Sequence, residues 1–312
     1  MRKEIKVSNK EFRNYNDLVS SAINWEHTCT YQLGVNALVG QHKTIELDDI
    51  QISYSRREGG MMHDVVSPKN SVSMAIIEEC EAEACFAKIK LSAGDIIFFD
   101  DKQSYSFMSK GRIKSVILSV NKHSNRAIIS RLSSLQGYVL KDNEAIIAKL
   151  LHQNEEKIVN TQEKILATVA KVLDAQEPKK AKLTKGEEIS FKILKDIYQH
   201  MDGAITIESL ALRYNVSEKT LQNSFKSLFG FTPKIFLRKL KLNLVHHELK
   251  NSTSIEMKVS RVAMKWGFKH MGSFAQYYKE LFGENPSQTL KYRYKEQFEI
   301  DKSCVSRQEE IE

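Results

Sequence analysis

A degenerate repeat near the C-terminal end constrains the fold of this chain more than any other feature. The first copy contains Leu210-Ala211, Val216, Leu221, Phe225, Phe229-Gly230 and Pro233, and the second contains Val262-Ala263, Phe268, Phe274, Tyr278, Phe282-Gly283 and Pro286. The offset is 52 residues up to Phe268 and 53 residues from Phe274 onward, so one residue is inserted where each copy would turn. Each copy has the length of a helix, a tight turn and a second helix. The repeat therefore predicts two helix-turn-helix units.

The first copy contains the residues that such a unit needs at its turn and at its helix ends. Ala211 is small where two crossing helices must approach closely, and Asn215 suits a left-handed turn position. Ser217 can cap the second helix, and Gly230 can end it. The spacing predicts one buried face on this second helix, made of Leu221, Phe225 and Leu228.

The second copy repeats this arrangement. Ala263, Gly267 and Phe268 form the expected turn, and Gly283 ends the second helix. Its expected buried face consists of Phe274, Tyr278 and Leu281. Two ordinary helical hairpins would give a similar apolar pattern, but the matched Phe-Gly-x-x-Pro stop in both copies favours paired helix-turn-helix units, which enter the major groove of DNA.

Between the copies, Pro233 to Lys250 is predicted to form one helix, with proline in its first turn. Its 18 residues would span roughly 27 Å. A rigid spacer of this length could place two recognition helices in successive major-groove segments, about 34 Å apart. The basic residues Arg238, Lys239 and Lys241 would then face DNA phosphates, or they form a solvated face; the sequence leaves both open.

Residues 190–293, about a third of the chain, resemble the DNA-binding domain of the AraC/XylS family of bacterial transcription regulators. The resemblance rests on Leu-Ala-x-x-Tyr-x-Val-Ser (210–217), Leu-Gln-x-x-Phe-Lys-x-x-Phe-Gly-x-x-Pro (221–233), Val-Ala-x-x-Trp-Gly-Phe (262–268) and Phe-Ala-x-x-Tyr-Lys-x-x-Phe-Gly-x-x-Pro-Ser (274–287). It implies a transcription regulator, with activation favoured over repression. It also implies binding to double-stranded DNA, RNA polymerase as a partner, and a bacterial cytoplasmic location, with nucleoid association when bound.

The resemblance also implies which residues contact DNA. Base contacts fall on the exposed positions of each second helix: Lys219, Gln222 and Asn223 in the first copy, and Met271, Ser273 and Gln276 in the second. The family often has Arg where Asn223 and Gln276 stand, and Asn and Gln suit adenine rather than guanine. We therefore hypothesise a target site richer in A·T than is usual for the family. The expected phosphate contacts are Lys226, Arg238, Lys279 and Arg293.

The charge distribution agrees with DNA binding by the C-terminal part. Residues 1–177 contain 23 basic and 23 acidic residues, whereas residues 186–295 contain 18 basic and 10 acidic ones. Basicity confined to the repeat region is the expected electrostatic footprint of a DNA-binding domain. The last segment, 296–312, has a net charge of −4.

Composition and turn signals divide the chain into four parts. We expect an effector-sensing or dimerisation domain at 1–175, a linker at 176–187, the DNA-binding domain at 188–295 and an acidic tail at 296–312. The linker is polar, interrupted by Pro178 and closed by Gly186. No run of about 18 apolar residues is present, so no membrane span is predicted. The four cysteines are scattered without a Cys-x-x-Cys pair and are expected to be reduced.

The N-terminal half predicts an antiparallel β-structure, which makes the whole chain an α+β protein. Short β-runs are expected at 45–54, 71–77, 84–91, 96–99, 104–107 and 115–120, separated by Gly, Asp and Ser turns. The turn Leu91-x-x-Gly94-Asp95-Ile96 resembles one common in cupin-like barrels, so a cupin-like barrel is expected. From Lys122 to Asp174 the pattern becomes helical, which predicts helices packed on the barrel.

Some apolar positions of these helices have two interpretations. Ile146 and Leu150 are expected in the core of their own domain. Ile165, Val169 and Val172 could lie in that core or in the seam of a homodimer, since such helices often mediate dimerisation in the family that the chain resembles.

Three classes of function remain open for the N-terminal domain. The first is control of the regulator by a small-molecule effector or by dimerisation; the second is a constitutive regulator without an effector. The third, a cupin-like enzyme fused to the DNA-binding part, is disfavoured because His27, His42 and His63 stand apart without a His-x-His motif. We therefore expect no catalytic residue, metal or cofactor. The segment Gly59-Gly60-Met61-Met62-His63 is interpreted as a loop with two buried methionines, or as part of a pocket.

Overall fold

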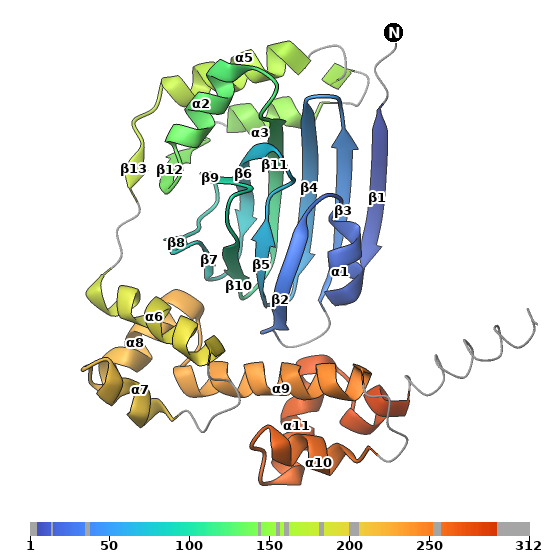
Figure 1. The fold of residues 1–312 in the computed structure, drawn as a ribbon, viewed down its shortest axis with the longest axis vertical. Coiled ribbons are helices and arrows are strands. Elements are labelled where there is room, and N and C mark those ends of the chain that lie inside the picture. Colours follow the sequence, from blue (N-terminus) through green and yellow to red (C-terminus); the bar gives the residue numbers. More distant parts are fainter. Residues whose placement is uncertain are drawn as a thin grey trace, which may run out of the picture.

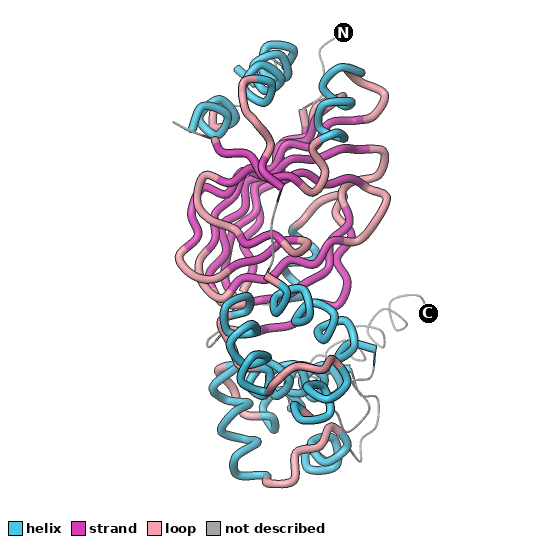
Figure 2. Tube along the Cα trace, turned by 90° about the vertical axis from the view of Figure 1, so that its left-hand side faces the viewer, coloured by secondary structure: helices cyan, strands magenta, loops and turns pink. Residues whose placement is uncertain are grey.

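A strand-rich N-terminal half lies against a helical C-terminal half (Figures 1 and 2). The structure, a computed structural model, describes residues 5–13, 15–34, 38–142, 145–153, 157–158, 162–180, 184–199, 206–251 and 257–291. Arg293 and the acidic tail predicted at 296–312 lie outside the described residues. No helix in these described ranges is long and apolar enough to cross a membrane.

The N-terminal half contains two antiparallel sheets. The large sheet has the strand order β1 (Lys6–Phe12), β3 (Val39–Glu46), β4 (Ile50–Glu58), β11 (Ile113–Asn121), β6 (Ser71–Cys80), β9 (Asp95–Asp100), β12 (Tyr138–Lys141) and β13 (Lys179–Lys180). The small sheet has the order β2 (Glu26–Gln32), β5 (Met61–Val66), β10 (Tyr105–Ser109), β7 (Ala84–Phe86) and β8 (Ile89–Lys90). Helix α1 (Tyr15–Ser21) joins β1 to β2.

The central strands of the large sheet are buried on both faces, which explains why they are nearly continuous apolar runs. On β6, Met74 and Ile76 face one core, whereas Ala75 and Ile77 face another. The first core lies under helices α2 (Arg126–Ser134), α3 (Ile146–Leu151) and α5 (Gln162–Asp174). The second core lies between the two sheets. The N-terminal half is therefore a three-layer stack of helices, large sheet and small sheet.

The expected closed, cupin-like barrel is not confirmed. Among the described strands, no hydrogen-bonded pair joins the large sheet to the small sheet. The mixed architecture itself, a sheet-rich half followed by a helical half, is as predicted. Alternating apolar residues specify that a strand has two buried faces, but they do not specify which strands pair at the edges, so the pattern could not decide between a barrel and stacked sheets.

Two strand predictions are corrected by the structure. The run at 45–54, predicted as one strand, is a hairpin of β3 and β4 in which the Leu47 amide bonds the Ile50 carbonyl. The run at 84–91 is likewise divided between β7 and β8. The segment 59–63, interpreted as a loop, enters β5 at Met61, and both of its methionines are buried as expected.

The C-terminal half consists of six described helices. They are α6 (Lys185–Gln199), α7 (Ile207–Arg213), α8 (Glu218–Phe229), α9 (Pro233–Asn251), α10 (Val259–Lys265) and α11 (Met271–Phe282). Helix α9 is the predicted spacer, one residue longer than expected. Strand β13 and the first residues of α6 fall within 176–187, the segment predicted as a linker.

The structure decides between the two interpretations of the apolar positions on α5. Ile165 and Val169 are fully buried within their own domain, under α2 and α3, and Val172 packs against the same core. Ile146, expected in the core, is 42% exposed, and Leu150 is partly buried. Periodicity correctly placed one buried face on α5, but it could not distinguish an internal core from a seam between two chains.

Candidate nucleic-acid interface and its attachment to the small sheet

The two helix-turn-helix units have the same backbone geometry at their turns. Asn215 and Gly267, which are equivalent in the repeat, have φ angles of 50° and 86°. After each of them, the next amide closes the turn: Val216 donates to the Ala211 carbonyl at 3.0 Å, and Phe268 donates to the Ala263 carbonyl at 2.9 Å. The repeat found in the sequence is thus a repeat in three dimensions.

The predicted helix ends are confirmed in both units. The Ser217 side chain accepts a hydrogen bond from the Thr220 amide and caps α8. Gly230 and Gly283 end α8 and α11 in the left-handed conformation, with φ of 67° and 75°. In contrast, His270 precedes α11 without a side-chain cap.

Each unit buries the apolar face that its spacing predicts. Leu221, Phe225 and Leu228 of α8 pack with α6, α7 and the first half of α9. Phe274, Tyr278 and Leu281 of α11 pack with α10 and the second half of α9. Because α9 contributes to both cores, it joins the two units as one continuous helix, as expected for a rigid spacer.

Five of the six predicted base-contacting residues are exposed. Lys219, Gln222, Asn223, Ser273 and Gln276 all have exposed side chains on α8 or α11. Met271 differs, because it is only partly exposed and packs against the core of the second unit. Gln276 donates a hydrogen bond to Glu280 at 3.0 Å. The exposed faces of both second helices thus carry the donors and acceptors that base-edge reading requires.

The predicted phosphate contacts have different surroundings. Lys226 and Lys279 are exposed in the last turns of α8 and α11. The guanidinium of Arg238 on α9 lies over the ring of Tyr277 on α11, 3.8 Å from its centroid, so it also stabilises the second unit against the spacer helix. Arg238, Lys241 and Gln222 line one groove that extends between the two units.

One histidine of α9 lies in the contact between the spacer helix and the second unit. His246 is partly buried against α11. Its Nδ1 lies 2.8 Å from the Tyr278 hydroxyl, and its ring stacks on Phe282 with centroids 4.3 Å apart. Burial lowers its pKa to about 4, with smaller contributions from Lys250 and His247. His246 therefore packs as a neutral ring between the spacer helix and the second unit.

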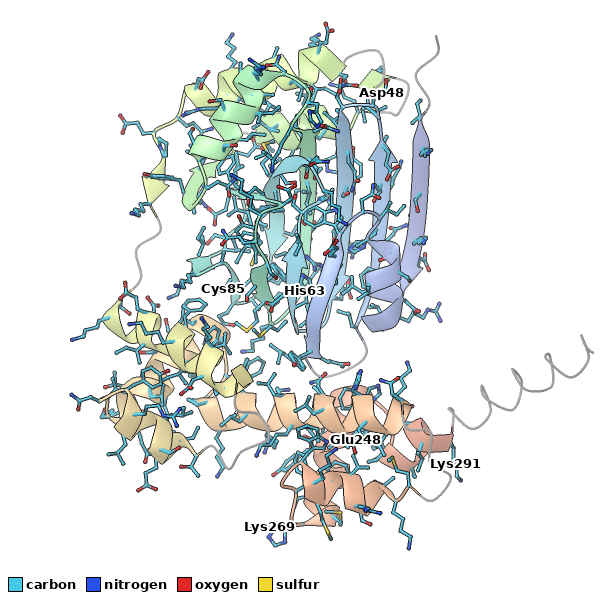
Figure 3. The ribbon with its side chains drawn as sticks, viewed as in Figure 1. Asp48, His63, Cys85, Glu248, Lys269 and Lys291 are labelled. Carbon is cyan, nitrogen blue, oxygen red and sulfur yellow. The ribbon has the colours of Figure 1, made fainter. Side chains whose placement is uncertain are left out.

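The first helix-turn-helix unit packs directly on the outer face of the small sheet. Five residues of that face share a buried core with α6, α8 and α9; they are Tyr31, Leu33, Met62, Cys85 and Met108. Figure 3 shows Cys85 on the side of the sheet that faces these helices. Its thiol donates to the Leu228 carbonyl at 3.2 Å, and burial raises its pKa to about 12. No motif around Cys85 or Leu228 indicates this contact.

Polar contacts surround this shared core. The Gln32 amide of β2 donates to Asn243 Oδ1 of α9 at 2.7 Å, and Asn243 Nδ2 donates back to the Gln32 carbonyl at 2.8 Å. Lys90 of β8 pairs with Glu187 of α6. Burial alone would raise the pKa of Glu187, but hydrogen bonds from Lys90 and Thr184 lower it to about 2. The carboxylate is therefore held ionised at this contact.

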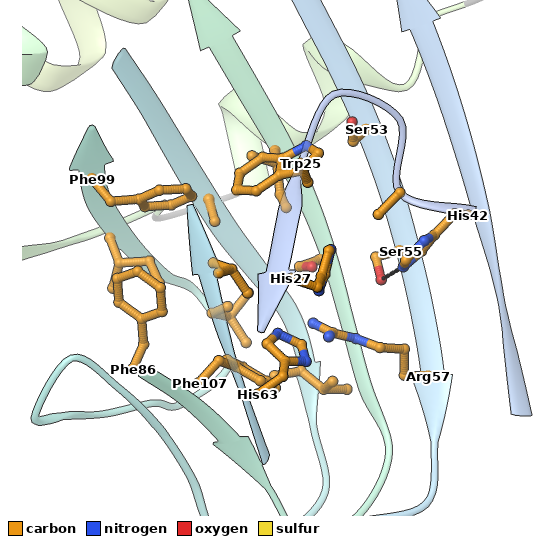
Figure 4. A pocket seen from close by; sticks show the side chains of 18 of the residues that line it. Trp25, His27, His42, Ser53, Ser55, Arg57, His63, Phe86, Phe99 and Phe107 are labelled. Carbon is orange, nitrogen blue, oxygen red and sulfur yellow. Dashed lines mark hydrogen bonds between the residues drawn. The ribbon is translucent and has the colours of Figure 1, made fainter. Parts of the chain in front are cut away.

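A cavity of about 80 Å³ lies between the two sheets, on the inner face of the small sheet (Figure 4). One side is apolar and includes Trp25, Phe86 and Phe99, whereas Arg57 and the three histidines His27, His42 and His63 lie on the other. The histidines, which stand apart in the sequence, converge here. Nevertheless, the part of the chain that the structure describes has no group of three His, Cys, Asp or Glu residues suited to hold a metal ion. Apart from these histidines, the polar residues of the lining were not predicted. Ser53, Ser55 and Arg57 alternate along β4, and polar residues at every second position of a strand form no distinctive motif.

Comparisons with known proteins agree with this geometry. A family profile described as a helix-turn-helix domain matches residues 210–292. The chain is 32% identical over 128 residues to the XylDLEGF operon transcriptional activator 2 of Pseudomonas putida, which covers 41% of this chain and 81% of that protein. The XylDLEGF operon transcriptional activator of the same organism is 32% identical over 113 residues, 36% of this chain and 35% of the relative. The chain thus matches about a third of the length of this second relative.

A solved structure, the AraC-like transcriptional activator CuxR, is 14% identical and covers 77% of this chain and 96% of that chain, with a TM-score of 0.42.

Paired helix-turn-helix units with exposed polar second helices define a class, the DNA-binding transcription regulators. Within that class, the chain belongs to the AraC/XylS family. The matched relatives are named as transcriptional activators, not as enzymes.

Proposed function

We propose that this protein is a sequence-specific DNA-binding activator of transcription that is controlled by its N-terminal half. The observation that carries the proposal is the matched geometry of the two units, whose second helices α8 and α11 leave polar faces exposed while their apolar faces are buried. In this proposal Lys219, Gln222 and Asn223 read bases with the first unit, and Ser273 and Gln276 read bases with the second. Residues 188–295 make the DNA contact, and RNA polymerase is the partner through which an activator acts.

Phosphate contact is assigned to Lys226 and Lys279, and to Arg238 at the groove between the units. Lysine and arginine contacts to phosphates position a protein on DNA without reading its sequence. Met271, which packs in the second core, is assigned a supporting role at the start of α11 rather than a base contact.

Control by the N-terminal half is supported by its direct packing on the first unit. The small sheet has the inter-sheet cavity on one face and the helices of the first unit on the other. A ligand in the cavity would therefore contact the small sheet, and the first helix-turn-helix unit packs on the other face of that sheet. In this proposal the two halves have two relative arrangements, only one of which binds DNA. The ligand favours the DNA-binding arrangement by no more than the difference between its affinities for the two arrangements. A constitutive regulator would respond to no ligand in this cavity.

The test is the salt dependence of DNA binding by the full-length protein. Binding to a duplex selected from random sequences should weaken steeply as salt increases, because phosphate contacts release counterions. Lys226→Ala should weaken binding to all sequences alike and reduce the salt slope by about 1. The matched control is Lys171→Ala, since Lys171 is exposed on α5, away from both units.

Lys171→Ala should bind like the unsubstituted protein. Absence of salt-dependent binding to any duplex would refute the proposed function. A Lys226→Ala variant that changed only sequence preference would refute the division into base-reading and phosphate-contacting residues.

A further inference from the structure

The inter-sheet cavity contains a cation without a counter-ion. Arg57 enters it from β4, and its side chain is buried, with the residue only 8% exposed. Its Nε has no hydrogen-bond acceptor among the described residues, and Nη1 contacts only the weakly accepting sulfur of Met61, at 3.7 Å. No ion pair links Arg57 to a carboxylate of the described chain. A buried arginine normally has such a partner, because removing a charge from water is costly unless it is paired.

Arg57 is charged at neutral pH despite this burial. Desolvation lowers its pKa only to about 10. The guanidinium lies over the ring of Phe107, 4.6 Å from its centroid, which compensates for part of the lost hydration. An aromatic face stabilises a cation less than a carboxylate does. The cavity therefore still favours the binding of an anion.

Two histidines beside Arg57 also have unused hydrogen-bonding atoms. Both ring nitrogens of His27 and Nδ1 of His63 are buried without a protein partner in the described residues. The two rings meet edge to face with centroids 5.1 Å apart, and the guanidinium of Arg57 extends toward them (Figure 4). Each neutral imidazole can donate one N–H to an oxygen.

His42 provides a contrast within the same cavity. Its Nδ1 lies 2.7 Å from the Ser21 hydroxyl, and its Nε2 lies 2.8 Å from the Ser55 hydroxyl. Both nitrogens of His42 therefore have partners, as most buried polar groups do. The unused donors are confined to the end of the cavity where Arg57, His27 and His63 meet.

The opposite end of the cavity suits an apolar group. Phe86 and Phe99 pack at 5.0 Å between ring centroids, and Trp25 lies 5.6 Å from Phe99. The cavity volume of about 80 Å³ is smaller than an engineered apolar cavity of roughly 150 Å³ that binds benzene. The space therefore fits a compact molecule, with at most a single ring accommodated by small movements of these side chains.

We propose that this cavity binds a compact monocarboxylate with an apolar body. The carboxylate pairs with Arg57 and accepts hydrogen bonds from His27 and His63, while the body packs against Trp25 and Phe99. A single buried cation suits one negative charge, whereas a phosphate dianion would require more positive charge. The inference names the class of ligand through which the N-terminal half would exert the control proposed above. Only this regulatory role rests on the proposed function; the binding of the ligand does not.

The same strands connect this ligand site to the DNA-binding half. On β5, His63 faces the cavity and its neighbour Met62 packs against the first unit. On β10, Phe107 faces the cavity and Met108 packs against the first unit. Adjacent residues of a strand point to opposite faces, so a ligand that shifts His63 or Phe107 also shifts the residues that support α8 and α9.

The test uses titration calorimetry on the full-length protein with butyrate, isovalerate and benzoate, each compared with its neutral amide. At least one carboxylate should bind saturably with a stoichiometry of about 1, and its amide should bind at least about tenfold more weakly. Arg57→Met should weaken carboxylate binding by a similar factor. The matched control is Arg56→Met, which removes the neighbouring arginine of β4, whose side chain is 57% exposed.

Arg56→Met should bind the carboxylate like the unsubstituted protein. Thermal unfolding of both variants establishes that they fold, and the comparison of acid with amide does not depend on any variant. Absence of carboxylate binding, equal binding of acid and amide, or unchanged binding by Arg57→Met would each overturn the inference. Salt-dependent DNA binding measured on the same preparation tests the proposed function separately, since it needs no ligand.

Discussion

Asn223 and Gln276 occupy matching positions on α8 and α11, and both are exposed. Each side-chain amide can donate a hydrogen bond to N7 of adenine and accept one from its N6 amino group. Asn223→Ala should therefore weaken binding to the target site by about 1–3 kcal/mol. The variant should also lose its preference for adenine at the one base pair that Asn223 faces. The measurement is affinity for the selected duplex and for duplexes changed at each position. Guanine selected at the positions that face both residues would contradict this assignment.

The buried histidines predict how stability depends on pH. Burial, together with the charge of Arg57, lowers the pKa of His27 to about 4 and that of His42 to about 3, from an ordinary value of 6.5. The unfolded chain therefore takes up protons first as the pH falls. The free energy of unfolding should be highest above pH 6.5, and His27 alone should lower it by roughly 3 kcal/mol between pH 6.5 and 4, with His42 adding to the fall.

Urea denaturation at several pH values measures this dependence. The variant His42→Phe should have a weaker dependence, whereas replacement of the exposed His123 by alanine should leave it unchanged. A free energy of unfolding that stays constant from pH 6.5 to 4.5 would show that these rings are hydrated in solution.

At the scale of single residues, the sequence was sufficient to predict those positions where the backbone conformation alone limits the residue type. Asn215, Ser217 and Gly230 were predicted because a left-handed turn, an N-cap and a C-cap each favour few residue types. The role of Arg57 was not predicted. Its neighbour Arg56 has the same residue type on the same strand, and only the pairing of β4 with its neighbours decides which of the two faces the cavity.

Helix α11 offers a matched pair of glycines at its two ends. Gly283 has a φ of 75°, and a Cβ there would meet no atom within 4 Å, so a substitution would change backbone strain alone. Gly272 lies in the first turn with helical backbone, and its Cβ would also meet nothing. Gly283→Ala should destabilise the protein by about 1 kcal/mol, whereas Gly272→Ala should stabilise it by about 0.4–1 kcal/mol.

Chemical denaturation of the two variants measures both effects, which should have opposite signs. If both substitutions changed stability in the same direction, the left-handed cap at Gly283 would not be the feature that ends α11.

At the scale of elements, the helices could be predicted more completely than the strands. A helix of the repeat has caps, a periodic face and a stop within about 12 residues, all of which are local. Strands β3 and β4 were fused in the prediction because the turn at Asp48-Asp49 is short and both flanks are apolar. Strand β5 was missed because its Met-Met-His-Asp sequence has little β-propensity, and its position is decided by pairing with β2 and β10.

At the scale of the whole molecule, the contact between the two halves could not be predicted. Asn243 and Gln32 are 211 residues apart in the sequence, and neither belongs to a motif. Gly34 and Gly60 also cross closely beside this contact, where a Cβ on Gly34 would lie 2.1 Å from the Gly60 nitrogen. The contact between the halves therefore depends on polar residues from distant segments, which come together only when both halves are folded.

The Asn243 side chain predicts how firmly the halves are held together. Asn243→Ala removes two hydrogen bonds to the buried backbone of Gln32, one donated and one accepted. Removing the partner of buried polar groups costs about 1–3 kcal/mol, so the free energy of unfolding should fall by that amount. Hydrogen exchange should become faster at β2 and at the middle of α9, whereas exchange within α5 should be unchanged.

The control is His247→Ala, which changes an exposed residue of the same helix and should leave stability and exchange unaltered. If the contact holds the DNA-binding half in one arrangement, Asn243→Ala should also change affinity for the selected duplex, because it releases α9 from the small sheet. Loss of stability without faster exchange at β2 would mean that Asn243 supports only its own helix, through its bond to the Lys239 carbonyl at 2.8 Å. Faster exchange at β2 and α9 together would instead establish that Asn243 holds the small sheet and the spacer helix against each other, which is the contact that control through the small sheet uses.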